Sequence, residues 1–217
     1  MLAPRYRDRR DAGQALARLL RDCAGRNNTL ILALPRGGVP VGFEISASLG
    51  APLDVFLVRK LGLPDQPELA MGAIASGGVR LLDDARIAEE QVSAAVVAEI
   101  TARETAELKR REVLYRGDRP APDFSRRRVI LVDDGVATGY TMRVAVLALR
   151  RLGPATITIA VPVGAPETCA VLANTVDELI CPLRPDLFQA VGYWYDRFPA
   201  VTDDEVRECL AHAAPSS

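Results

Sequence analysis

The stretch VILVDDGVATGYTM, residues 129–142, joins an apolar run to two adjacent acids and then to a turn of small and hydroxyl-bearing residues. Residues 129–133 predict a buried strand, and the apolar pattern that resumes after the turn predicts a helix over 139–152. The first N–H groups of a helix have no partners within it and attract phosphate. The carboxylates of Asp133 and Asp134 are pure acceptors, which suit sugar hydroxyls or a hydrated Mg²⁺. A ligand with both a diol and a phosphate would satisfy both halves, although one acid could simply cap the helix.

The rest of the chain predicts an α/β fold with a mostly parallel central sheet. Short apolar runs indicate about five buried strands, and segments with helical spacing lie between them. The expected strands are 29–35, 53–60, 129–133, 155–163 and 178–182; the expected helices are 9–22, 41–50, 85–116, 139–152, 165–174 and 203–213; residues 61–84 should be mainly loop, with short strands near 73–74 and 79–82. Neither a Walker loop nor the dinucleotide fingerprint is present.

Ligands of parallel sheets lie at the carboxyl ends of the strands, and three expected strand ends carry unusual chemistry. Besides Asp133-Asp134, these are the stretch 35–38, PRGG, and the pair Arg59-Lys60. Arg36 offers a forked donor for a diphosphate, and Gly37 and Gly38 permit close approach of a ligand to the backbone. If the strands share one sheet, the three groups should converge, but each could also be an ordinary turn or a solvated charge.

The stretch 129–142 resembles the phosphoribosyl-diphosphate (PRPP) motif of the type I phosphoribosyltransferases. The resemblance covers roughly residues 25–200 and implies that family's fold in a single domain, 1–217, with a core over about 25–182, an inserted long helix over 85–116 and a small C-terminal hood over about 183–200. It implies that Asp133 and Asp134 bind the ribose hydroxyls. The 5′-phosphate would be held by the loop, at Ala137, Thr138, Gly139, Tyr140 and Thr141.

Other segments are similar to further parts of the same family. LPRGGVPVG, residues 34–42, is similar to its pyrophosphate loop, so Arg36, Gly37 and Gly38 would bind PRPP. Lys60 matches a cation that reaches the diphosphate in adenine phosphoribosyltransferases. Residues 67–78 would form the mobile catalytic loop, with Glu68 either stabilising the transition state or merely exposed to solvent.

The aromatic segment 185–198 is similar to the hood of the 6-oxopurine enzymes, and otherwise reads as a satellite hydrophobic cluster. The resemblance assigns acceptor binding to Phe188, Tyr193 and Trp194, and a place near the metal to Asp196 together with Asp133 and Asp134. Those enzymes carry an aspartate just before Thr-Gly as a general base, whereas this chain has Ala137. The acceptor therefore stays open.

The resemblance implies a Mg²⁺-dependent transferase that moves 5-phosphoribosyl from PRPP to a nitrogen nucleophile, a nucleobase-like acceptor, and releases diphosphate. Asp133, Asp134, Arg36, Lys60 and Glu68 are the candidate catalytic residues. A PRPP-binding regulatory or partner-dependent protein with little turnover is the alternative. The long helix 85–116 is either a solvated helix or, as we expect, part of a homodimer contact.

Bulk composition excludes several other classes. Hydrophobic residues make up 49% of the 217, and the net charge of −1 gives no general basis for nucleic-acid binding. Four scattered cysteines and a single histidine, His212, argue against a zinc site. No apolar run is long enough to span a membrane, and the first residues lack a signal-peptide core, so we expect a cytoplasmic protein.

Overall fold

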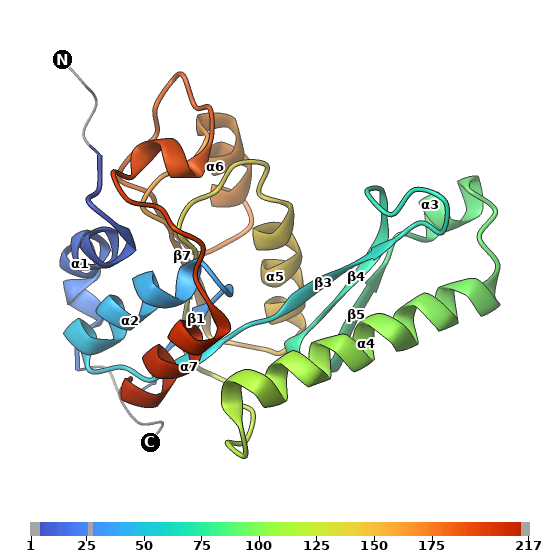
Figure 1. The fold of residues 1–217 in the computed structure, drawn as a ribbon, viewed down its shortest axis with the longest axis horizontal. Helices are drawn as coiled ribbons and strands as arrows, with labels where there is room; N and C mark the ends of the chain where they lie inside the picture. The colour runs from blue at the N-terminus through green and yellow to red at the C-terminus, as the bar shows by residue number, and fades with distance from the viewer. Residues whose placement is uncertain (1–4, 26–27, 214–217) are drawn as a thin grey trace.

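A five-stranded parallel sheet forms the centre of the fold in the computed structural model, which describes residues 5–25 and 28–213 (Figure 1). Its strand order is β2-β1-β6-β7-β8, and every neighbouring pair is parallel. The strands are β1 (Thr29–Ala33), β2 (Leu53–Val55), β6 (Arg128–Val132), β7 (Thr156–Ala160) and β8 (Glu178–Ile180). The predicted parallel α/β sheet is confirmed, because strands buried on both faces are encoded as continuous apolar runs.

Helices cover both faces of this sheet. Ile31 and Ile130 point into a core shared with α1 (Arg9–Leu19), α2 (Gly38–Leu49) and α7 (Asp203–His212). Leu30 and Leu131, which alternate with them, point into a second core shared with α5 (Tyr140–Arg151) and α6 (Pro166–Ala173). The period-two alternation of a strand thus serves two cores at once.

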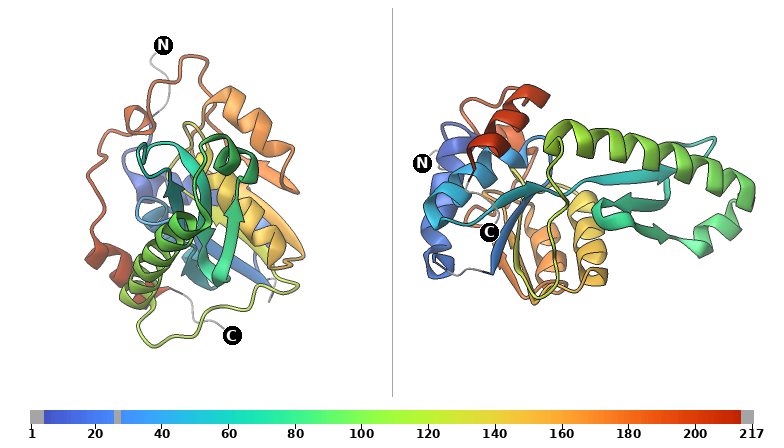
Figure 2. Two further views of the ribbon diagram at one scale, coloured as in Figure 1. Left: turned by 90° about the vertical axis from the view of Figure 1, so that its right-hand side faces the viewer. Right: turned by 90° about the horizontal axis from the view of Figure 1, so that it is seen from below.

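Residues 58–116 form an arm that projects from the side of the sheet (Figure 2). It contains an antiparallel sheet in the order β3-β4-β5, with α3 (Asp84–Glu89) and the long α4 (Ala94–Arg116). The strands are β3 (Val58–Gly62), β4 (Ala70–Ala75) and β5 (Val79–Leu82), with a short 3-10 turn, η2 (Ser76–Gly78), between the last two.

The arm corrects three sequence predictions. The expected strand 53–60 is divided at residues 56–57 between two different sheets, because its two halves find different partner strands. Within the expected loop 61–84, the short strands predicted near 73–74 and 79–82 are present as β4 and β5, but β4 is longer than predicted and β3 extends to Gly62. The expected single helix 85–116 is two helices, separated at a left-handed residue, Gln91, with φ 51°.

A buried polar network joins the arm to the central sheet. At the end of α4, Arg116 Nε donates to both oxygens of Asp54 on β2, at 2.9 and 3.0 Å, and Arg116 Nη2 donates to the carbonyl of Val55 at 2.9 Å. Arg116 also pairs with Glu112, which accepts a hydrogen bond from Ser76 in η2. The root of the arm is therefore fixed by charged groups withdrawn from water.

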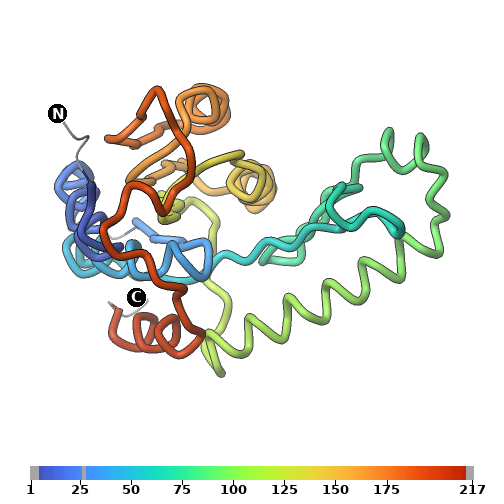
Figure 3. Tube along the Cα trace, turned by 45° about the horizontal axis from the view of Figure 1, so that its top comes forward, coloured from blue at the N-terminus to red at the C-terminus, as the bar shows by residue number. Residues whose placement is uncertain are grey.

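The C-terminal segment runs from β8 past α1 to α7 (Figure 3). It includes the 3-10 turn η3 (Val191–Trp194), and Tyr195 pairs with Tyr6 in an isolated parallel bridge. Trp194 and Tyr195 pack with Ala12 of α1 and Val163 in a third hydrophobic cluster. A further 3-10 turn, η1 (Arg21–Cys23), follows α1. Within the described ranges, no helix is both long and apolar enough to cross a membrane.

Candidate functional site

Asp133 and Asp134 lie at the carboxyl end of β6, in the middle of the central sheet. Asp133 Oδ1 accepts the backbone N–H of Asp134 at 2.9 Å. Burial raises the pKa of Asp133 well above its usual range, and the neighbouring charge of Asp134 adds to the effect. Burial also raises the pKa of Asp134, although a hydrogen bond from Arg9 opposes that rise. The site therefore holds two carboxylates whose charges are costly unless a cation or donor joins them.

The loop between β1 and α2 packs directly against these acids. A Cβ on Gly37 would overlap Asp134 Oδ2, and one on Gly38 would lie 2.7 Å from the carbonyl oxygen of Val132. A Cβ at either position would collide with the acid-bearing strand, whereas the predicted close approach of a diphosphate to Gly37 and Gly38 stays a prediction. The peptide bond between Pro35 and Arg36 is cis.

Arg36 itself leaves this loop toward solvent. Its Nη1 lies 3.8 Å from Asp203 Oδ1 at the start of α7, and about half of its side chain is exposed. Asp203 also accepts a hydrogen bond from Tyr115 at 2.7 Å. The guanidinium is thus accessible at the rim, where diphosphate binding stays a prediction.

The turn after the acids, residues 135–139, exposes side chains to solvent, and its backbone is hydrogen-bonded to Val163 and Thr168. Val136 N donates to Val163, and Thr168 Oγ1 donates to the carbonyl of Ala137 at 2.6 Å. Gly139 has φ 70°, a left-handed conformation, and α5 begins at the next residue. The side chains of Ala137, Thr138, Tyr140 and Thr141 are exposed. A rigid turn with exposed hydroxyls before the N-terminus of a 12-residue helix is typical of an anion site.

Arg59 and Lys60 do not lie at the edge of the central sheet, so the predicted convergence of three strand ends of one sheet is wrong for this pair. They belong to β3 in the arm. Lys60 Nζ donates to the carbonyl of Glu68 at 2.9 Å and lies 3.4 Å from its Oε2. Lys60 nevertheless shares a cavity of about 710 Å³ with Thr141, between β3 and α4.

Glu68 lies in the turn that joins β3 to β4, and its side chain is 96% exposed. The predicted catalytic loop 67–78 is mostly β4 and η2, so only the residues before Ala70 belong to an irregular loop. The short strand predicted near 73–74 is present but longer, and its six residues from Ala70 pair in the arm sheet.

The C-terminal aromatic residues divide between the interior and the surface. Trp194 is 5% exposed and part of the third hydrophobic cluster, against which Phe188 is partly buried. Tyr193 is half exposed, with Arg5 4.4 Å from its ring centre. Trp194 therefore lies in a hydrophobic cluster, as the alternative interpretation of this segment predicts, and little of its surface is open to an acceptor.

Asp196 is exposed next to Tyr195, whose hydroxyl donates to the backbone carbonyl of Asp134 at 2.5 Å. The role of Asp196 as a metal ligand stays a prediction.

The sequence model of the phosphoribosyl transferase domain family matches residues 7–193. The chain belongs to this family. A crystal structure of TT1426 from Thermus thermophilus is 39% identical and superimposes with a TM-score of 0.84, over 97% of this chain and all of that one. AQ2163 from Aquifex aeolicus, 13% identical with a TM-score of 0.50 over 94% of this chain and 86% of that one, shares the fold alone.

A Mycobacterium tuberculosis protein provisionally named a phosphoribosyl transferase is 43% identical over 208 residues. The match covers 96% of this chain and 47% of the relative, so the chain spans about half the length of the curated relatives it matches. The type I phosphoribosyltransferase fold predicted from the sequence is confirmed.

The phosphoribosyltransferase domain contains two acid-binding residues that sequence reasoning missed. Arg9 pairs with Asp134 from 125 positions away in the chain, and Tyr195 reaches it from 61 positions away. Arg9 lies outside every motif, and Tyr195 lies in the hood-like segment 185–198 but received no role there. The only signals in the sequence were the basic charge of the N-terminal segment and the aromatic content of the C-terminal one.

Within the described ranges, no group of three or more histidine, cysteine or acidic side chains is arranged to hold a metal ion. Asp133 and Asp134 supply two carboxylates, which fits Mg²⁺ only where a ligand's own oxygens complete its coordination. That is the donor set expected of a metal that arrives with a diphosphate.

Proposed function

We propose that the chain transfers the 5-phosphoribosyl group of PRPP to a nitrogen nucleophile and releases diphosphate. The observation that carries this proposal is the arrangement at the end of β6. Two partly buried acids are followed at once by an open turn at a helix N-terminus, and the loop at Gly37 packs against them. A phosphorylated ribose carries both a diol and a phosphate, which explains why carboxylates lie beside an anion site.

Each group then has a distinct task. Asp133 and Asp134 accept hydrogen bonds from the ribose hydroxyls, and the turn 137–141 donates backbone N–H and hydroxyl groups to the 5′-phosphate. Arg36 and Lys60 balance the charge of the departing diphosphate from two sides, which stabilises the transition state electrostatically. Mg²⁺, when bound with the substrate by the acid pair, supplies further positive charge to that diphosphate.

The acceptor is proposed to be nucleobase-like. Phe188 and Tyr193 belong to the C-terminal segment and are partly or half exposed, and flat aromatic rings suit a flat ligand. Ala137 is exposed in the turn and offers no carboxylate to deprotonate a purine. An acceptor that needs little deprotonation therefore fits this site best.

Diphosphate release from PRPP and Mg²⁺, measured with a panel of nucleobases and small amines, tests the proposal. Release with at least one acceptor, lost in Asp133→Asn, would support it. Tight PRPP binding without release would favour the regulatory alternative. In that case Lys60, which donates to the carbonyl of Glu68, would not reach the diphosphate. Absence of PRPP binding would refute both.

The chain is further proposed to act as one domain and as a homodimer. The central sheet and the arm share the network around Arg116, which couples their folding. The exposed side of α4 carries five alanines and the 66%-exposed Val113 beside charged side chains, which would pair across an interface between two copies. The charged residues are Glu99, Arg103, Lys109 and Arg110. Analytical ultracentrifugation would test the dimer, and a single unfolding transition would test the single domain.

A further inference from the structure

We propose that Arg9 is a positioning residue for the reaction: it holds the Asp134 carboxylate against Gly37 so that the acid pair meets the ligand in one fixed arrangement. The inference rests on the proposed function and adds a residue that lies outside the acid, glycine and phosphate segments. Its basis is a set of contacts made by α1 and the C-terminal segment.

The contact between Arg9 and Asp134 is short and nearly dry. Arg9 Nε donates to Asp134 Oδ2 at 2.7 Å, and the two side chains are only 10% and 15% exposed. A charge-assisted hydrogen bond in such surroundings is screened little by water or salt. It therefore restrains the direction of the carboxylate more strongly than a surface ion pair would.

Arg9 is itself held by the C-terminal segment. Its Nη1 donates to the carbonyl of Pro199 at 2.7 Å, and its guanidinium carbon lies 3.7 Å from the ring centre of Phe198. The same segment provides the Tyr195 hydroxyl that bonds the backbone carbonyl of Asp134. Tyr195 thus bonds the main chain of Asp134, and Arg9 bonds its side chain.

These hydrogen bonds occupy some oxygens of the acid pair and leave others for a ligand. Asp134 Oδ2 is taken by Arg9, and Asp133 Oδ1 is taken by the backbone of Asp134. Among the described residues, no protein hydrogen bond reaches Asp134 Oδ1 or Asp133 Oδ2. Within that part of the chain, one oxygen of each acid therefore has no protein hydrogen bond and can accept one from a ligand hydroxyl.

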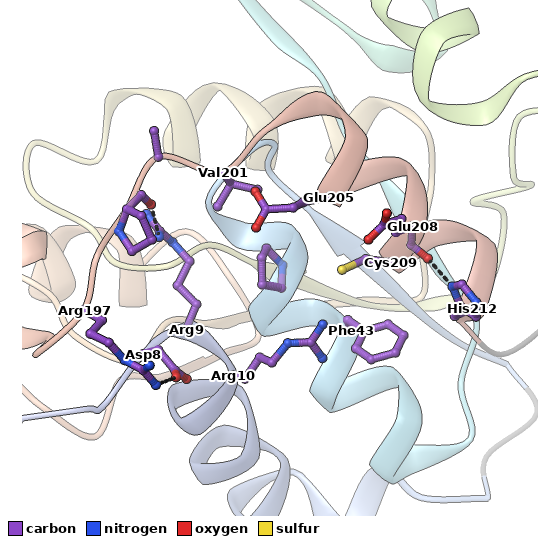
Figure 4. Close-up of a pocket in the computed structure, with 13 residues that line it drawn as sticks. Asp8, Arg9, Arg10, Phe43, Arg197, Val201, Glu205, Glu208, Cys209 and His212 are labelled. Atoms are coloured by element: carbon purple, nitrogen blue, oxygen red, sulfur yellow. Dashed lines mark hydrogen bonds and ion pairs between the residues drawn. The ribbon is translucent and has the colours of Figure 1, made fainter.

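The adjacent Arg10 provides a matched control. It leaves the same helix toward a different place (Figure 4), where its Nη1 bonds Glu44 at 2.9 Å and its guanidinium lies 5.2 Å from the ring of Phe43. The two arginines thus have the same chemistry, an acid and a phenylalanine each, but only Arg9 reaches the acid pair.

The first experiment measures PRPP·Mg²⁺ binding by calorimetry in Arg9→Met, Arg9→Lys and Arg10→Met. We expect Kd to rise about tenfold to a hundredfold in Arg9→Met, since a misplaced binding group costs that much. Arg9→Lys should recover part of the loss, and Arg10→Met should stay within about twofold of wild type because its contacts are on the surface. Equal affinity in Arg9→Met and Arg10→Met, with wild type binding PRPP, would overturn the inference.

The second experiment needs no ligand. A double-mutant cycle on urea unfolding combines Arg9→Met with Asp134→Asn, and the two changes should be clearly non-additive because the residues touch. Additivity would show that Arg9 does not hold Asp134 and would overturn the inference. Failure of wild type to bind PRPP would instead refute the proposed function, while the cycle still decides the contact.

Discussion

Gly37→Ala should disable the acid pair while leaving most of the fold intact. Gly37 has φ −60° and ψ −35°, a conformation that alanine adopts readily, so the backbone itself does not resist the change. The new Cβ, however, would overlap Asp134 Oδ2 and lie 2.6 Å from its Cγ. Nonbonded carbon atoms settle at about 3.5–4.0 Å, so the carboxylate and the loop must separate by about 1 Å.

That separation determines the expected magnitude. Asp134 cannot simply swing away, because Arg9 and Tyr195 hold it at its side chain and main chain. Crowding of this kind costs about 1–3 kcal/mol of the free energy of unfolding. A displacement of about 1 Å in a binding group costs about a hundredfold in activity, so we expect that loss in PRPP affinity and in diphosphate release.

Gly153→Ala separates the effect on the site from the effect on stability. Gly153 follows the far end of α5, has φ 71°, and has no atom within 4 Å of an added Cβ. Alanine there is strained by about 1 kcal/mol, since the left-handed region disfavours a Cβ. Calorimetry with PRPP·Mg²⁺ should therefore show normal affinity in Gly153→Ala. If Gly37→Ala bound PRPP equally well, the reasoning that ties the glycine loop to Asp134 would be refuted.

Three further outcomes are expected. Arg116→Met should lower the free energy of unfolding by about 3–5 kcal/mol in urea titrations, because it leaves the buried Asp54 unpaired. The control Arg110→Met removes an exposed ion pair and should not move the unfolding midpoint. Asp133→Asn should remove one component of the pH dependence of stability. Burial raises the folded-state pKa of Asp133, so the contribution of this group to stability is fully present below the unfolded value of about 3.9 and is lost as pH rises through the folded value. An equal loss of stability over the same pH range in the variant would contradict this. Tyr195→Phe should cost about 0.5–1.5 kcal/mol in the same titrations, since only the hydrogen bond to Asp134 is lost, and an unchanged midpoint would argue against that bond.

The sequence by itself determined the features that are local in the chain. The stretch 129–142 contains a strand, its acids and the start of a helix in order, so its structure follows from neighbouring residues alone. Continuous apolar runs likewise require a sheet that is buried on both faces, and this fixed the fold class. The glycines at 37 and 38 were singled out for close approach of a ligand, whereas their contact with the acid-bearing strand appeared only in the structure.

Tertiary structure decided every feature that depends on which distant segments meet. The apolar run 53–60 does not encode its partner strands, and pairing with β1 and β4 assigned its halves to different sheets, which placed Lys60 in the arm. Arg9 reads as one more charge in a basic N-terminal segment until α1 packs beside Asp134. Apolar patterning sets how much each segment buries, but charge partners 125 residues apart follow only from the packed arrangement of the helices.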